Sequence, residues 1–242
     1  MALIRLDAAG VTVPGPPAER TILAPTTLEL AERRIGVVGG NGSGKSTLVR
    51  LLNGLVTPTT GRVLLDDVDV ARRGAAVRRR VGFCFTDPSA QLVMPTCVED
   101  VELSLRRTVR DRATRRAAAI DVLDRFGLAH LADVSVHALS GGQRQLLALA
   151  GVLATEPDVL VTDEPTTLLD LRNTRLVAAT LFDLDVQLVL VTHDLELAAR
   201  CERVLVVADG AVVADGPAEA SIAAYVASVE AGGPAGAGGS GR

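Results

Sequence analysis

Residues 39–46 read Gly-Gly-Asn-Gly-Ser-Gly-Lys-Ser, and this stretch constrains the fold more than any other part of the chain. It directly follows the apolar run Ile35 to Val38 and directly precedes a segment with helical apolar spacing. Glycines in such a turn let backbone N–H groups wrap around phosphate oxygens, while the lysine adds a full positive charge. A turn that binds nothing would not need a lysine and a serine in register at a helix start. The sequence therefore predicts a strand, a phosphate-binding loop and a helix in succession.

The residues expected to hold phosphate lie in this loop and in the first turn of the helix. They are Gly39, Gly40, Asn41, Gly42, Ser43, Gly44, Lys45, Ser46 and Thr47. Among them, Ser46 is placed to offer its hydroxyl to a Mg²⁺ ion.

Apolar runs with little alternation recur along the chain and predict strands that are covered on both faces, as in a parallel sheet. They are Ile35 to Val38, Val81 to Phe85, Val159 to Thr162, Leu188 to Thr192 and Val204 to Val207. Helical patterns between several of them are Lys45 to Asn53, Ser140 to Ala154, Asn173 to Leu184 and Leu195 to Cys201. Such alternation predicts an α/β core. Gly54 is placed to end the first helix and Ser140 to cap the second.

The composition excludes several classes of protein. Of the 242 residues, 48% are hydrophobic and 22% charged, which is typical of a globular protein with a substantial core. A net charge of −4, basic residues spread along the chain and five aromatic residues argue against nucleic-acid binding. The cysteines, at positions 84, 97 and 201, lie far apart and suit a reducing compartment. We expect neither a secretion signal nor a membrane span.

Two adjacent acids, Asp163 and Glu164, follow the apolar run that begins at Val159. At the carboxyl end of a strand in an open α/β sheet, such side chains point into the ligand crevice. Asp163 can hold Mg²⁺ through water, and Glu164 can orient or deprotonate a water that attacks a γ-phosphate. An acid pair after a strand is by itself more often a solvated turn. The phosphate-binding loop earlier in the chain favours the catalytic interpretation.

A second anion site is predicted where the run Leu139-Ser-Gly-Gly-Gln-Arg-Gln145 opens a helix. Its Ser-Gly-Gly start concentrates free N–H groups at the helix N-terminus, where negative charge is favoured. The expected ligands are Ser140, Gly141, Gly142 and Gln143. A helix start that is merely capped by its serine is the alternative for this motif taken alone.

The order and spacing of these motifs resemble those of the ATP-binding subunits of ABC transporters. The resemblance extends to Asp170 and to His193 in Val-Thr-His-Asp194. It implies a RecA-like P-loop NTPase core with a mainly parallel sheet, an N-terminal antiparallel β subdomain and a helical subdomain inserted at about residues 91–150. The ABC ATPase domain would then span residues 1–228, and the glycine-rich residues 229–242 would form a disordered tail.

The resemblance also implies a mechanism. Two ATPase subunits, identical or different, meet head to tail with ATP between the phosphate-binding loop of one and the Ser140 to Gly142 segment of the other. ATP and Mg²⁺ close the pair, and hydrolysis opens it again. Glu164 and His193 are then the expected catalytic residues, with His193 contacting the γ-phosphate and helping to hold the attacking water.

Residues 85–96 resemble the ATPases of energy-coupling-factor vitamin importers. In these proteins a groove beside this segment receives a transmembrane coupling subunit, which works with a substrate-binding membrane subunit. Here Leu92, Val93, Met94 and Pro95 would supply apolar side chains to that groove. The resemblance therefore implies a peripheral protein on the cytoplasmic face of the cell membrane.

Two positions depart from the family pattern. Thr86 stands where a glutamine usually reaches the metal and the attacking water, so we expect an oxygen ligand with a shorter reach. The reading Phe-Thr-Asp-Pro88 is similar to that of biotin-type importers. Val13 replaces an aromatic residue that would stack on adenine, a contact worth about 1–3 kcal/mol by analogy with nucleic-acid stacking.

Two other functions are the alternatives to an importer ATPase. They are a soluble ABC ATPase without a transport role and a low-turnover nucleotide switch.

Overall fold

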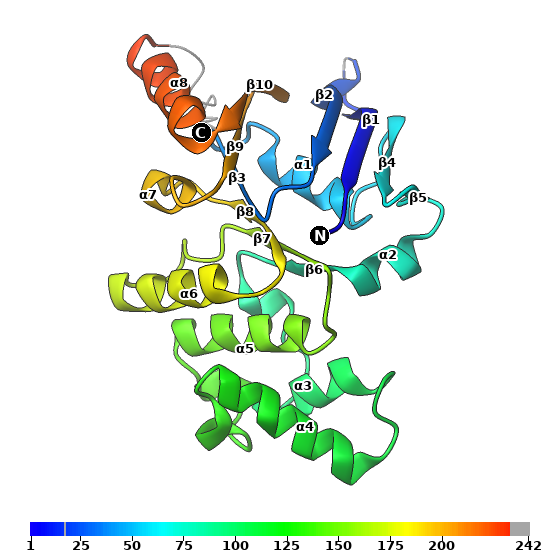
Figure 1. Ribbon diagram of the computed structural model, residues 1–242, viewed down its shortest axis with the longest axis vertical. Helices are drawn as coiled ribbons and strands as arrows, with labels where there is room; N and C mark the ends of the chain where they lie inside the picture. Colours follow the sequence, from blue (N-terminus) through cyan, green and yellow to red (C-terminus); the bar gives the residue numbers. More distant parts are fainter. Residues whose placement is uncertain (17, 233–242) are drawn as a thin grey trace.

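The computed structural model describes residues 1–16 and 18–232, and its strands form two sheets (Figure 1). The larger sheet has six strands in the order β10-β9-β3-β8-β7-β6. They are β3 (Arg34–Val38), β6 (Val81–Cys84), β7 (Val159–Asp163), β8 (Gln187–Val191), β9 (Arg203–Ala208) and β10 (Ala211–Pro217). Neighbours pair in parallel except β10, which runs antiparallel to β9. Every residue of β3, β6, β7 and β8 is buried, which explains their apolar sequences and confirms the predicted core.

The smaller sheet is antiparallel and has the order β2-β1-β4-β5. Its strands are β1 (Ile4–Val13), β2 (Arg20–Leu30), β4 (Thr60–Leu65) and β5 (Val68–Asp69). Helix α1 (Lys45–Leu52) packs into one hydrophobic core with residues of both sheets through side chains such as Leu48 and Leu51. The N-terminal β subdomain is thus confirmed, and α1, which follows the inner strand β3, packs between it and the larger sheet.

The helical subdomain occupies the lower half of Figure 1 and shares one continuous hydrophobic core with a face of the larger sheet. It consists of α3 (Cys97–Leu105), α4 (Arg112–Arg125) and α5 (Gly141–Leu153), with short 3₁₀ turns at Ala129–Leu131 and Val136–Ala138. α3 packs against both α4 and α5. The other helical elements are α2 (Gly74–Arg80), a 3₁₀ turn at Pro88–Ala90, α6 (Leu171–Asp183), α7 (Leu195–Ala198) and α8 (Ala218–Glu230).

Most helix ends follow the signals in the sequence. Ser140 caps α5, and Gly54, with a φ of 72°, follows the end of α1. The predicted tail begins too early, because α8 continues through Glu230. Residues 233–242 of that tail lie outside the described residues. None of the helices in the described ranges is both long enough and apolar enough to cross a membrane.

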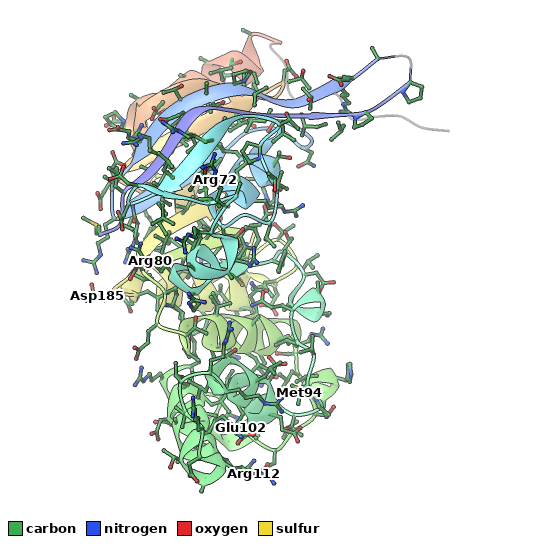
Figure 2. All side chains as sticks on the ribbon, turned by 90° about the vertical axis from the view of Figure 1, so that its right-hand side faces the viewer. Arg72, Arg80, Met94, Glu102, Arg112 and Asp185 are labelled. Carbon is green, nitrogen blue, oxygen red and sulfur yellow. The ribbon has the colours of Figure 1, made fainter. Side chains whose placement is uncertain are left out.

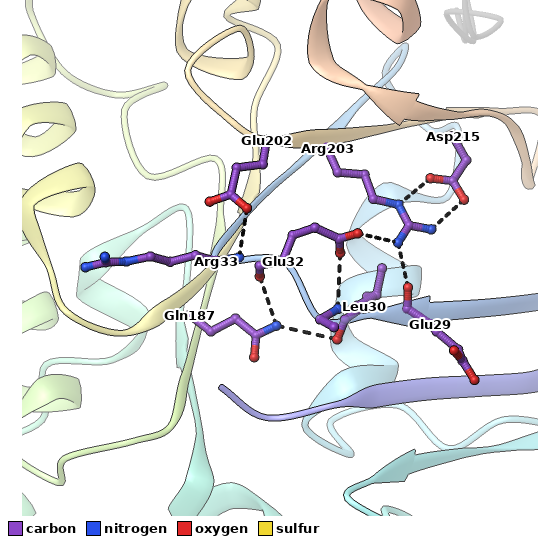
Figure 3. A network of polar contacts seen from close by, with 9 residues as sticks. Glu29, Leu30, Glu32, Arg33, Gln187, Glu202, Arg203 and Asp215 are labelled. Carbon is purple, nitrogen blue, oxygen red and sulfur yellow. Dashed lines mark hydrogen bonds and ion pairs between the residues drawn. The ribbon is translucent and has the colours of Figure 1, made fainter.

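Arg203 fastens the connection between β2 and β3 to the larger sheet (Figure 3). Its guanidinium donates to both carboxylate oxygens of Asp215 at 2.6 and 2.7 Å and to the backbone oxygen of Glu29 at 2.7 Å. It also pairs with Glu32 at 3.0 Å. The bonds to Asp215 raise the pKa of Arg203. Burial raises the pKa of Glu32, but hydrogen bonds from backbone N–H groups and from Arg203 lower it overall.

Candidate functional site

The phosphate-binding loop between β3 and α1 follows a path that requires glycine. Gly39 has a φ of 147°, and a Cβ there would lie 2.0 Å from the carbonyl oxygen of Val207 on β9. Gly44, with a φ of 106°, precedes α1 and has no side chain to cap it. The first N–H groups of α1 therefore stay available to an anion.

Lys45 is the only lysine in the sequence, and it is 5% exposed. Its Nζ donates to the carbonyl oxygens of Gly39 and Gly40, both at 2.8 Å. Burial lowers the pKa of Lys45, and the nearby carboxylates of Glu164 and Asp163 oppose that shift. An entering phosphate would give this ammonium a negatively charged partner in place of two neutral carbonyls.

Two side chains of α1 hold the carboxylate of Asp163, which ends β7 and is 2% exposed. Ser46 Oγ donates to Oδ1 at 3.0 Å, and the Arg50 guanidinium lies 3.1 Å from Oδ2. The structure thus brings together Ser46 and Asp163, the two main candidates for binding Mg²⁺. Sequence analysis did not identify Arg50, although its position four residues after Ser46 places both on one face of a helix.

Thr86, the third candidate for the metal, contacts Asp163 through the backbone. Its hydroxyl donates to the carbonyl oxygen of Asp163 at 2.7 Å and so ties the segment after β6 to the end of β7. The hydroxyl oxygen keeps lone pairs for another partner. A direct bond from Thr86 to a metal stays a prediction, and the contact that the structure shows is a link between strand ends.

Glu164 and His193 lie together at the carboxyl ends of β7 and β8. Glu164 has a φ of 51°, and its N–H donates to the carbonyl oxygen of Val191 at 3.0 Å. Its carboxylate accepts from Thr167 Oγ1 at 3.0 Å and lies 3.7 Å from Nδ1 of His193. A left-handed backbone at a charged residue is sparsely populated and typical of functional sites. Both side chains reach solvent, at 20% and 59% exposure, so a water can approach them.

The second predicted anion site is built as a capped helix start. Ser140 Oγ accepts from the N–H of Gln143 at 3.3 Å, and Gln143 Oε1 accepts from the N–H of Ser140 at 2.9 Å. Gly142 is needed for packing, because a Cβ there would lie 2.3 Å from Asn173 Oδ1. No hydrogen bond between described residues joins this segment to the phosphate-binding loop of the same chain.

The segment after Thr86 connects this site to the helical subdomain. The Gln91 side chain accepts from the N–H of Phe85 and donates to a carbonyl oxygen of α5, both at 3.3 Å. The buried carboxylate of Asp100 accepts from the N–H groups of Val93 and Met94 at 2.8 and 3.0 Å. We call Leu92 to Pro95 the apolar turn, and these bonds hold it against α3 and α5.

A pocket of about 290 Å³ opens beside this turn, lined by residues of α2, β6, α3 and α5. Val93 lines it, together with Arg78 of α2 and Leu103 of α3. The other three apolar residues expected to form a partner groove are not part of this lining. Leu92 packs against the hydrophobic core instead. Met94 lies on the side of the molecule that faces the viewer in Figure 2.

The donor set fits a nucleotide phosphate bound with a divalent cation. The Ser43 hydroxyl is buried in the loop and has no hydrogen-bond partner in the described part of the chain. Ser46 and Asp163 offer oxygen ligands of the kind that Mg²⁺ prefers. In residues 1–16 and 18–232, no group of three or more His, Cys, Asp or Glu side chains could hold a metal alone. A cation here would take its other oxygens from phosphate and water.

Comparisons with known proteins agree with this geometry. A family model described as ABC transporter matches residues 26–167. A putative ABC transporter ATP-binding protein of Deinococcus radiodurans is 47% identical over 207 residues, which cover 86% of this chain and 92% of the relative. The biotin transport ATP-binding protein BioM of Rhizobium etli is 45% identical over 222 residues, which cover 92% and 97% of the two chains.

Solved structures show the same similarity. CbiO1 of Clostridium perfringens, part of the ABC transporter complex CbiONQ, has a TM-score of 0.78 at 29% identity and is matched over 92% of each chain. The dimeric ATP-binding cassette MJ0796, in a post-hydrolysis state bound to ADP and phosphate, has a TM-score of 0.80 at 29% identity. That match covers 89% of this chain and 98% of the cassette.

Proposed function

This chain belongs to the ABC transporter family of ATP-binding proteins and is an ATPase, and we propose that it is the energy-coupling subunit of a vitamin importer. The assignment of the reaction rests on one observation: the uncapped start of α1 lies next to Asp163, which is followed by Glu164. The importer role is supported by the similarity to BioM and to CbiO1 over nine-tenths of the chain.

In the proposed reaction, Lys45 and the loop N–H groups hold the terminal phosphates of ATP. Glu164 takes a proton from the attacking water, while His193 contacts the γ-phosphate. Ser46 and Asp163 would hold Mg²⁺, which would neutralise part of the phosphate charge. The bond from Thr167 to Glu164 keeps the base oriented before the nucleotide arrives.

We further propose that a second copy of the chain completes the site. Ser140 and Gly141 lie at the start of α5 with no bond to the loop of their own chain among the described residues. In a head-to-tail pair, the Ser140 hydroxyl and the N–H groups of Gly141 and Gly142 would face the γ-phosphate held by the other copy. The dimeric state of the similar cassette MJ0796 supports such a pair.

The pocket beside α3 is the proposed seat of a transmembrane coupling subunit. Its apolar lining and its position next to Gln91 favour an amphipathic helix as the occupant. Movement of that helix would reach Asp163 through the segment that contains Thr86. A membrane subunit that binds the vitamin completes the complex, and the identity to BioM makes biotin the first substrate to test.

Two experiments separate these claims. Glu164→Gln should keep ATP binding but lose hydrolysis, and hydrolysis at the parent rate would contradict the role of Glu164.

Val93→Asp should leave hydrolysis in solution unchanged but detach the chain from membrane subunits purified from native membranes. Val213→Asp is the matched control, because Val213 is also exposed, at 60% against 67%, but lies on β10. Equal retention of the two variants on the membrane subunits would refute the pocket assignment.

For the substrate, the complex purified with its membrane subunits should retain radiolabelled biotin. Retention of no biotin, while nucleotide-dependent behaviour is intact, would reject biotin and leave the ATPase assignment in place.

A further inference from the structure

Two arginine-rich segments that are separated in the sequence lie on one side of the molecule. Residues 71–80 and 106–116 hold eleven of the 25 basic residues and one of the 29 acidic residues of the chain. The first covers α2, and the second covers the turn from α3 into α4. Figure 2 shows this side, with Arg72 and Arg80 above and Arg112 below. A chain with a net charge of −4 thus has two arginine clusters on one side, where Figure 2 also shows the acidic Asp185 and Glu102.

Most of these arginines have no partner that would explain them. Among the described residues, Arg106, Arg107, Arg110 and Arg112 are exposed and form no ion pair. We call these four residues the basic turn. Asp111 is the one acid within the turn, and it caps α4 by accepting from the N–H of Thr114 at 2.8 Å.

Two further arginines are used to shape the turn. Arg115 donates to the carbonyl oxygens of Val109 and Arg110 at 3.0 and 3.1 Å, and Arg116 pairs with Asp133 at 2.6 Å. These contacts fix the backbone of the turn while the side chains of the basic turn stay in solvent. At α2, Arg73, Arg78 and Arg79 are likewise exposed, and Arg78 lines the pocket beside α3.

We propose that this side of the molecule binds the anionic headgroups of a lipid bilayer through the basic turn and through Arg73, Arg78 and Arg79. Long cationic side chains without a shaped cavity recognise a diffuse negative surface, and such clusters are typical of contacts with acidic lipids. Of the two clusters only Arg78 lines the pocket, so a helix seated there would leave the basic turn, Arg73 and Arg79 free to contact the bilayer around it. The proposal rests on the proposed function for the position of the membrane, but the binding itself requires no membrane subunit.

An acidic segment of a membrane protein would be the competing partner for the same charges. Such a segment would need complementary positions on both clusters. The acidic Glu102 also lies on this side, between Met94 and Arg112 in Figure 2. Because charges in solvent act over a short range, Glu102 would repel an acidic peptide bound next to it more than it would repel an extended lipid surface.

The test uses the purified full chain and protein-free vesicles of phosphatidylcholine with or without phosphatidylglycerol. The chain should sediment only with the anionic vesicles, and binding should weaken as salt rises. Each arginine near such a surface contributes about a fivefold increase in partition, so Arg107→Gln with Arg110→Gln should reduce partition roughly 25-fold. Arg107→Lys with Arg110→Lys keeps the charge and should keep most of the binding.

The matched control removes the same charge elsewhere. Arg172 and Arg175 are exposed on α6, which lies on the opposite side of the molecule from that seen in Figure 2. Replacing both with glutamine should leave vesicle binding near the parent level. An equal loss in this control would show that net charge acts rather than one side of the chain, and would overturn the proposal.

Absence of binding to anionic vesicles would also overturn it and would assign the arginines to an acidic protein segment. Failure of the ATPase assignment has a different signature. Lys45→Ala should lose nucleotide binding yet sediment with anionic vesicles like the parent, because Lys45 is buried in the loop and contributes nothing to this surface.

Discussion

Replacement of Arg50 with glutamine isolates the support that α1 gives to Asp163. The substitution removes the guanidinium 3.1 Å from Oδ2 and leaves the Ser46 hydroxyl as the remaining side-chain partner of the carboxylate. Asp163 is 2% exposed, but the Arg50 side chain is 41% exposed, so the pair lies between a buried and a surface ion pair. Breaking a buried pair costs about 3–5 kcal/mol and a surface pair about 1 kcal/mol or less. We therefore expect a loss of about 2 kcal/mol in the free energy of unfolding.

For a chain of this size, that loss corresponds to a decrease in Tm of about 4–8 °C. Circular dichroism during heating, in EDTA and without nucleotide, measures it directly. Arg172→Gln is the control, because Arg172 is exposed and forms no ion pair with the residues that the structure describes, so its loss should change stability by less than about 0.5 kcal/mol. Arg50→Lys, which keeps the charge but loses the fork geometry, should fall between the two.

The same variant tests a positioning role. Without Arg50, the Asp163 carboxylate is free to turn away from Ser46, so more Mg²⁺ should be needed for half-maximal nucleotide binding. A Tm equal to that of Arg172→Gln, together with an unchanged Mg²⁺ requirement, would refute the assignment of Arg50 as the residue that orients Asp163.

Three further changes follow from single contacts. Gly142→Ala should lower the Tm, because the new Cβ would lie 2.3 Å from Asn173 Oδ1. Gly141→Ala should not lower it, because the nearest neighbour of its Cβ would be 3.6 Å away. Equal Tm values for the two variants would contradict the packing argument. Thr86→Val should lower kcat about tenfold with ATP affinity unchanged, and Thr86→Ser should restore it; a pure change in affinity would count against the link to Asp163. The pKa of Glu32 lies below its ordinary 4.5, so its carboxylate stabilises the fold above that pH and loses this effect as the pH falls through the folded pKa. Glu32→Gln should therefore melt below the parent at neutral pH and converge with it in acid, and a constant difference in Tm would contradict this.

The sequence predicts those parts of the molecule whose cause is local. The phosphate-binding loop needs glycines, a lysine and a serine in one octapeptide, and Ser140 caps α5 through contacts within one helical turn. Strands such as β7 are recognisable because burial on both faces favours an unbroken apolar run, here Val159 to Val161. For the same reason Asp163 stands out at the strand end.

Long-range contacts could not be predicted in this way. Arg50 and Asp163 are 113 residues apart, and only the packing of α1 beside β7 brings them together. Gly142 was expected as an anion ligand, but its lack of a side chain is required by Asn173 on another helix. The two arginine clusters could not be placed either, since they come from separate segments and only the fold brings them to one side of the molecule.

The central claim is that two copies close over ATP held between the loop of one and Ser140 of the other. Sedimentation velocity of Glu164→Gln with saturating ATP and Mg²⁺ tests it most directly. We expect a dimer that dissociates when ATP is replaced by ADP, and we expect the added change Ser140→Arg to abolish the dimer while each chain still binds ATP. A chain that stays monomeric with ATP, or a dimer that tolerates Ser140→Arg, would contradict the shared site.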